Sequence, residues 1–314
     1  MFLFRKNKNK IKQFLVRVFV LNDHRPRKSV TSPRSFTARD WHFVLLETRL
    51  ALKDSNAVML SSGTAFYTTL AFFPLVAAVI AFFAYSIDID QLNSALTTIE
   101  IYFPVDIAAL IGTQLQSAYE YSTSNILIAA GAVAIALVSA TRAMLTLVSS
   151  VNAAYQQKET RSTLSVLSMS IIMSVGAIVL TAILLTLVLV DQSFLMHLGM
   201  PALLATLLPF VRWILLAAII TISLAVFYRV APSNHNPHWK WVSWGAGIAS
   251  VIWLAGTTLF FLYAKYLSIY SNVYNVFGSI IVLLVWFNLT SYIVLLGATI
   301  NHRLEQRTTR RTTK

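Results

Sequence analysis

Six long apolar runs constrain this chain more than any other feature. They lie near residues 58–86, 126–150, 167–190, 210–228, 242–264 and 276–300. A helix that crosses the hydrocarbon core of a bilayer needs roughly 20 mainly apolar residues, because each residue advances about 1.5 Å. Charged residues make up only 12% of the chain, about half the fraction typical of a soluble domain. The sequence therefore predicts an all-α polytopic membrane bundle of six transmembrane helices.

The distribution of Lys and Arg predicts the orientation of these spans. Thirteen, two, two and five of these residues occur respectively in segments 1–57, 151–166, 229–241 and 301–314. By contrast, only Lys265 occurs in the intervening connections, at 87–125, 191–211 and 265–275. Because short cytoplasmic loops are enriched in Lys and Arg, we expect an even number of crossings with both termini in the cytoplasm.

The same pattern divides the chain and indicates its partners. We predict a basic cytoplasmic N-terminal region with amphipathic helices at 1–57, a six-span domain at 58–300 and a basic cytoplasmic tail at 301–314. The net charge of +13 could indicate nucleic acid, but its placement at the ends favours the anionic inner leaflet. We therefore expect membrane lipids as partners and no specific nucleic acid; the sequence leaves homo-oligomerisation open.

Three segments have the spacing of helices that lie on the membrane rather than cross it. The first, from Ile11 to Phe19, predicts an interfacial helix or, alternatively, a disordered basic arm. The second begins after Thr37, whose spacing to Asp40 suits a capping box, with one face formed by Trp41, Val44, Leu45 and Leu52. The third follows Pro104 in the first external connection, at residues 107–118.

The sequence predicts no catalytic residues, no cofactor and no metal site. The chain contains no Cys, and His235 and His238 have no acidic cluster beside them. The cytoplasmic acids form no tight motif for metal-assisted hydrolysis. Because the chain also lacks a phosphate-binding Gly-Lys motif, any transport would be passive or coupled to a gradient rather than driven directly by a nucleotide.

Two residues inside the predicted spans are candidates for a functional role. Arg142 lies about eight residues, or roughly 12 Å, from the predicted cytoplasmic end of its span. It could extend to the interface or bind an anion such as a lipid phosphate. Pro74 removes a backbone donor from the first span, so it predicts a bend that either acts as a hinge or is static packing.

Three further polar residues could contact a substrate or headgroup. Asn152 and Tyr155 follow the second span and lead into the cytoplasm, and Asn288 belongs to a polar band near the middle of the sixth span. Capping and hydrogen bonding between helices are the alternative roles of these groups. Small residues in the last two spans, Gly245, Gly247, Ala249, Gly297 and Ala298, predict close helix approach.

Several local sequences resemble the YihY/BrkB family. They are GTAFYTTLAFFPL at 63–75, ATRAMLTLVSSVNAAY at 140–155 and YNVFGSIIVLLVWFNLTSYIVLLGATIN at 274–301, within a resemblance covering roughly residues 41–303. The resemblance implies a six-helix bacterial inner-membrane protein, of a family that has been labelled ribonuclease BN, linked to virulence and serum resistance, and suggested to export lipids. Thr299 departs from relatives that have an acidic residue there.

Three functions follow as hypotheses. Translocation or export of an anionic lipid or amphiphile fits the basic ends, Arg142 and the bent first span. A noncatalytic scaffold or envelope-integrity protein is the alternative, and a ribonuclease is disfavoured because the site signal is weak.

Overall fold

The computed structural model describes residues 36–84, 97, 108–109, 112–113, 126–189, 202–233, 239–267 and 275–312. Within these ranges the protein is all-α, as the sequence predicts. Its long helices are α2 (Ala38–Asp54), α3 (Ala57–Ala84), α6 (Ile126–Ala154), α7 (Thr163–Leu189), α9 (Ala202–Val230), α10 (Trp239–Leu267) and α11 (Asn275–Thr312).

Six helices in the described ranges are long and apolar enough to cross a membrane, which confirms the six-span prediction. They are α3, α6, α7, α9, α10 and α11. Several helices continue beyond the predicted apolar runs: α6 reaches Ala154 and α11 reaches Thr312. Apolar composition defines the part of a helix in hydrocarbon, whereas backbone hydrogen bonds can continue the helix into a polar environment.

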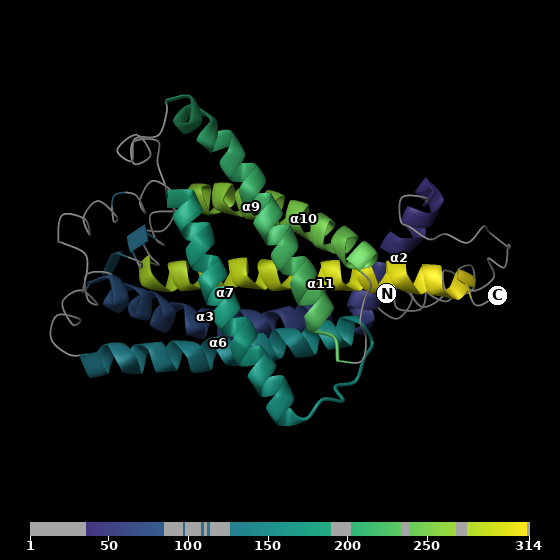
Figure 1. Cartoon of the computed structure of the whole chain (residues 1–314), viewed down its shortest axis with the longest axis horizontal. Coiled ribbons are helices and arrows are strands. Elements are labelled where there is room, and N and C mark those ends of the chain that lie inside the picture. The colour runs from purple at the N-terminus through teal and green to yellow at the C-terminus, as the bar shows by residue number, and fades with distance from the viewer. Residues whose placement is uncertain are drawn as a thin grey trace, which may run out of the picture.

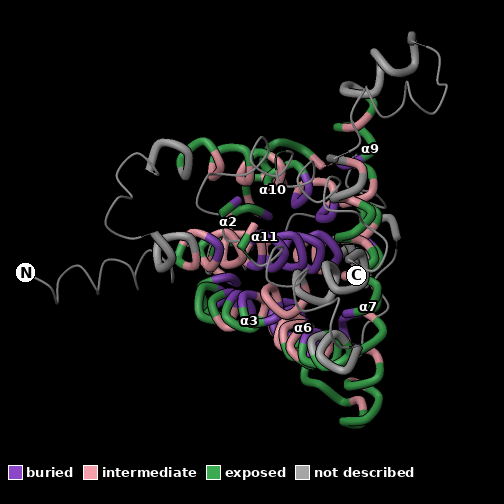
Figure 2. The backbone as a smooth tube through the Cα atoms, turned by 90° about the vertical axis from the view of Figure 1, so that its left-hand side faces the viewer, coloured by how far each residue is buried: buried purple, intermediate pink, exposed green. Residues whose placement is uncertain are grey.

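Helix α11 is the centre of the bundle (Figure 1). It packs against α3, α6 and α10 along the spans and against α2 near its C-terminal end. Buried residues gather along α11, whereas α7 and α9 form the exposed flank (Figure 2). In the apolar window of α7 only 11% of residues are buried, compared with 33% in α11. Helix α7 is therefore mainly a peripheral helix facing the surroundings of the bundle.

The contact between α10 and α11 is a backbone-to-backbone approach, as Gly245, Ala249 and Gly297 predict. The prediction is wrong for Gly247, because nothing lies within 4 Å of its Cβ position. A Cβ atom placed on Gly245 would meet the Asn301 side chain and, at 2.5 Å, the Gly297 carbonyl oxygen. A Cβ atom on Gly297 would meet the Tyr228 hydroxyl and Ala249. The Gly245 N–H donates to Asn301 Oδ1 at 2.8 Å, so a hydrogen bond closes the same contact.

Helix α2 forms an elbow that leads into the first span. The predicted capping box is present: the Thr37 hydroxyl accepts from the Asp40 N–H, while the Asp40 carboxylate accepts from the Thr37 N–H. Val44 packs with Ile300 and Leu304 of α11. The prediction that Leu45 shares this face is wrong, because Leu45 is 57% exposed and lies about 100° around the helix from Val44.

The other two predicted surface helices fall wholly or mostly outside the described residues. The segment from Ile11 to Phe19, His235 and His238 lie outside the described residues, as does most of 107–118.

Replacing Gly245 with Ala is expected to lower the thermal midpoint of the detergent-solubilised protein. The added methyl would force α10 away from α11, and overpacking of this kind typically costs about 1–3 kcal/mol. Differential scanning fluorimetry of the intrinsic Trp signal would measure the change. Gly247→Ala is the matched control, since nothing lies within 4 Å of its Cβ position. Equal midpoints for the two variants would contradict the proposed contact.

Candidate functional site

Two connections and the C-terminal part of α11 meet at the end of the bundle where α2 lies, hereafter the α2 end. Helix α6 stops there because Gln156 adopts a left-handed backbone conformation with φ of 56°. The Gln157 N–H then donates to the Asn152 carbonyl at 2.9 Å, which is typical of a helix C-terminus. Helix α9 ends just before Pro232, a residue that cannot continue the helical hydrogen bonds.

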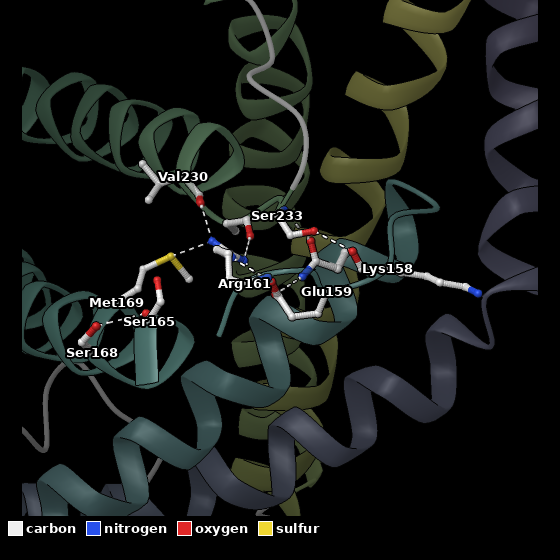
Figure 3. A network of polar contacts seen from close by, with 10 residues as sticks. Lys158, Glu159, Arg161, Ser165, Ser168, Met169, Val230 and Ser233 are labelled. Carbon is white, nitrogen blue, oxygen red and sulfur yellow. Dashed lines mark hydrogen bonds and ion pairs between the residues drawn. The ribbon is translucent and has the colours of Figure 1, made fainter. Parts of the chain in front are cut away.

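A network of four side chains, hereafter the loop clasp, joins these two connections (Figure 3). It consists of Asn152, Glu159, Arg161 and Ser233. The Arg161 guanidinium donates to both Glu159 carboxylate oxygens at 2.9 Å and to the Ala231 carbonyl at 2.8 Å. Ser233 donates its hydroxyl to the Lys158 carbonyl at 2.9 Å. The clasp therefore fixes the connection after α6 to the connection after α9.

Asn152, near the end of α6, bonds to both connections of the clasp. Its side chain is buried, and its amide nitrogen donates to Glu159 at 2.8 Å while its oxygen accepts from the Ser233 N–H at 2.9 Å. Both polar atoms of the amide are thus engaged within the protein. In this arrangement Asn152 acts as a connector between two loops, with no polar atom directed to a ligand.

Glu159 is held in its charged form. The hydrogen bond from Arg161 lowers the pKa of the Glu159 carboxyl to about 2, with a further contribution from the Asn152 amide, against a smaller opposing effect of burial. Because its folded pKa lies below the ordinary value of about 4.5, Glu159 contributes stability above that value. This contribution is lost as the pH falls towards 2.

Tyr155 lies behind the clasp in a buried polar layer. It has no exposed surface, and its ring contacts the His302 imidazole with centroids 5.2 Å apart. Burial raises the pKa of the Tyr155 hydroxyl and the charge of Glu305 raises it further, whereas a hydrogen bond with the Asn301 side chain opposes the rise. Asn301 also accepts from Gly245, so this layer joins α6, α10 and α11.

Arg142 has a very different environment. It is exposed on α6, and within the part of the chain that the structure describes its guanidinium has no hydrogen-bond or ion-pair partner. The apolar window of α6 ends at Ala154, and Arg142 lies about 18 Å along the helix from that end. The sequence estimate of roughly 12 Å ended the span at residue 150, whereas the helix itself continues to Ala154.

The seam between α3 and α6 adds a second polar group at this depth. Thr146 of α6 lies 3.8 Å from the Cβ position of Gly63 on α3. Because consecutive spans run antiparallel, one further turn along each helix brings Tyr67 level with Arg142. Tyr67 is 37% exposed, so its ring also reaches the outer surface of the bundle.

The remaining two predicted residues lie in other parts of the bundle. Asn288 of α11 donates to the Ser62 hydroxyl of α3 at 2.7 Å, a bond between helices of the kind that the sequence offered as the alternative role. Pro74 is half-buried inside a continuous α3. The structure thus brings Asn152 and Tyr155 to one end and leaves Arg142, Asn288 and Pro74 at separate positions. The buried Thr299 hydroxyl bonds only within α11, to the Leu295 carbonyl.

Sequence reasoning missed most of the clasp and the layer behind it. Glu159 looked like a scattered acid, and Ser233, Asn301 and Glu305 had no distinguishing pattern. The partners in the clasp are up to 81 positions apart in the chain, so no local motif could pair them.

Comparisons with known proteins agree with the fold. The family model described as virulence factor BrkB matches residues 50–314. A relative from Bacillus subtilis, named "Putative ribonuclease-like protein YfkH", is 29% identical over 252 residues, which cover 79% of this chain and 90% of the relative. A UPF0761 membrane protein of Idiomarina loihiensis is 29% identical over 97 residues, or 31% of this chain and 34% of the relative. No solved structure matches the chain.

Replacing Glu159 with Gln is expected to lower the thermal midpoint at pH 7, because the ion pair with Arg161 is lost. The difference from the unchanged protein should shrink as the pH falls from about 4.5 towards 2, where Glu159 itself becomes protonated. Thermal scans across this pH range would measure it. Arg161→Gln and the double variant complete a mutant cycle, and additive losses would show that the two side chains do not act together.

Proposed function

The chain belongs to the virulence factor BrkB family of membrane proteins, and from that premise we propose that it moves an anionic lipid or amphiphile across the bilayer. Transport would be passive or coupled to a gradient. The proposal places the protein in the bacterial inner membrane with both termini, and so the α2 end, in the cytoplasm. The excess of Lys and Arg in the segments at that end supports this orientation.

The exposed guanidinium of Arg142 carries the proposal. An arginine at the centre of a span costs about 2.5–3.5 kcal/mol on insertion scales, and such residues usually pair or face a polar path. Arg142 is exposed on α6, about 18 Å along the helix from its last residue at the α2 end. A phosphate-bearing headgroup that passes along α6 would provide the missing anion.

The rest of the bundle supports a surface route rather than an open pore through the α2 end. At that end the loop clasp uses its polar groups on one another. Arg142 is instead exposed on α6, and Tyr67 is 37% exposed on α3, each one turn from the close approach of Gly63 to Thr146. A lipid could therefore keep its acyl chains in the bilayer while its headgroup meets Arg142.

Two other functions compete with this proposal. The name of the Bacillus subtilis relative suggests a nuclease, but the described residues contain no group of three or more His, Asp or Glu that could share a metal ion, and no observation favours cleavage. The second competing function is a scaffold that gathers partners at its basic end. Scaffolding would not require an unpartnered cation deep in α6, and this difference makes Arg142 the residue to test.

Replacing Arg142 with Gln is expected to slow the movement of fluorescent phosphatidylglycerol in proteoliposomes by about tenfold, equivalent to losing about 1.4 kcal/mol of headgroup attraction. Arg142→Lys should retain part of the rate, because it keeps the charge but not the bidentate geometry. Dithionite reduction of the label reports its transfer between leaflets.

The matched control is Lys158→Gln, which removes one exposed positive charge at the α2 end and should leave the rate unchanged. Arg142→Gln should slow the transfer of labelled phosphatidylcholine less than it slows the transfer of labelled phosphatidylglycerol. A correctly folded Arg142→Gln protein with the full rate would refute the role of Arg142. No movement by the unchanged protein would refute translocation itself and favour the scaffold.

Replacing Pro74 with Ala tests whether α3 has to bend during transport. The substitution restores an N–H that can donate to the Leu70 carbonyl, so the thermal midpoint should stay the same or rise. If Pro74 is a hinge, the rate of lipid movement should fall several-fold in the same proteoliposome assay. Pro209→Ala makes the same change within α9 and should have no such effect. An unchanged rate for Pro74→Ala would identify a static packing bend.

A further inference from the structure

Helix α2 separates its charged residues between two faces. Asp40 and Glu47 lie on the face towards α11, where both carboxylates approach the Arg307 guanidinium, at 3.6 and 3.5 Å. Arg307 also lies over the Phe43 ring, with its guanidinium carbon 5.0 Å from the centroid. Asp40 and Glu47 are thus both paired with the Arg307 cation within the fold. They do not offset the charges on the opposite face.

That opposite face is a basic stripe, here called the α2 stripe. At 100° per residue its members fall within about 120° of the helix surface, and all are exposed. They are Arg39, His42, Leu45, Arg49 and Lys53. Within α2 itself the remaining acid is Asp54, at the last position of the helix. The stripe therefore presents three fixed positive charges around a single exposed leucine.

The packing of α2 against α11 places the stripe at the depth of lipid headgroups. The apolar span of α11 runs for 28 residues, from Ile280 to Arg307, which is about 42 Å of helix. The hydrocarbon core is only about 30 Å thick, so the last turns of this span extend into the interface. These are the turns, from Ile300 to Arg307, that α2 contacts.

We propose that the α2 stripe binds the phosphate groups of anionic lipids in the adjacent leaflet. The cations supply the attraction and Leu45 enters the boundary between headgroups and acyl chains. An RNA backbone has the same phosphate chemistry, but it offers no apolar layer for Leu45. This inference adds a lipid-binding surface to the proposed function and does not depend on Arg142.

A single fluorescent label can test the proposal because the chain contains no Cys. Leu45→Cys, labelled with an environment-sensitive dye, would be placed in nanodiscs of phosphatidylcholine alone or mixed equally with phosphatidylglycerol. Quenching by acrylamide, which is uncharged, would measure exposure of the dye. We expect at least about twofold less quenching in the anionic discs at low salt, and loss of that difference at high salt.

Substitutions then identify the source of the effect. The double variant Arg49→Gln/Lys53→Gln should abolish the difference in quenching between the neutral and the anionic discs. Lys158→Gln, with one cation removed outside the stripe, should preserve it. Arg142→Gln should also preserve it, so the lipid-binding surface can be tested even if the proposed translocation fails. The high-salt measurement on the labelled protein needs no further variant and stands if the double variant does not fold.

Two outcomes would overturn the proposal. One is equal quenching in neutral and anionic discs, which would show that anionic lipid does not engage the stripe. The other is protection of the dye in neutral discs by added single-stranded RNA with no response to phosphatidylglycerol. That result would assign the stripe to nucleic acid instead.

Discussion

The close approach of α10 and α11 is the contact on which the arrangement of the other helices depends. Between helices in a bilayer there is no hydrophobic driving force, so association relies on packing and on hydrogen bonds across the contact. Gly245 and Gly297 allow the two backbones to meet, and Asn301 closes the contact from α11. Tyr228 then joins α9 to the same region by donating to the Val294 carbonyl at 2.8 Å. The position of α11 in turn determines where α2 and the connections at the α2 end can lie.

How much of this could be predicted depends on how local the physical signal is. Span number and the capping box of Thr37 and Asp40 follow from short-range patterns, and both were predicted correctly. The clasp needs Asn152 beside Ser233 and Arg161 beside Ala231, which only the folded bundle brings together. Leu45 failed for a subtler reason: helical spacing restricted it to a wide sector, and the α11 contact covers only part of that sector.

The end of a membrane helix is hard to predict from sequence, yet its position affects how a residue inside the helix is interpreted. An apolar run indicates where hydrocarbon begins, but the α6 helix continues to Ala154 and so increases the distance from Arg142 to the α2 end. The interpretation of Arg142 as an anion site was open from the sequence alone, and it gains support from the exposure of the side chain.

The contrast between satisfied and unsatisfied polar groups also bears on what kind of anion would be moved. A soluble anion entering from water at the α2 end would first meet the clasp, where Arg161 is already occupied by Glu159 and two backbone carbonyls. Opening that route would break a charged network before any new contact formed. Arg142 instead faces the surroundings of α6, where a lipid is already present and only its headgroup has to enter an unfavourable environment. Under the proposed function, this geometry favours an amphiphile that approaches from within the bilayer over a water-soluble anion.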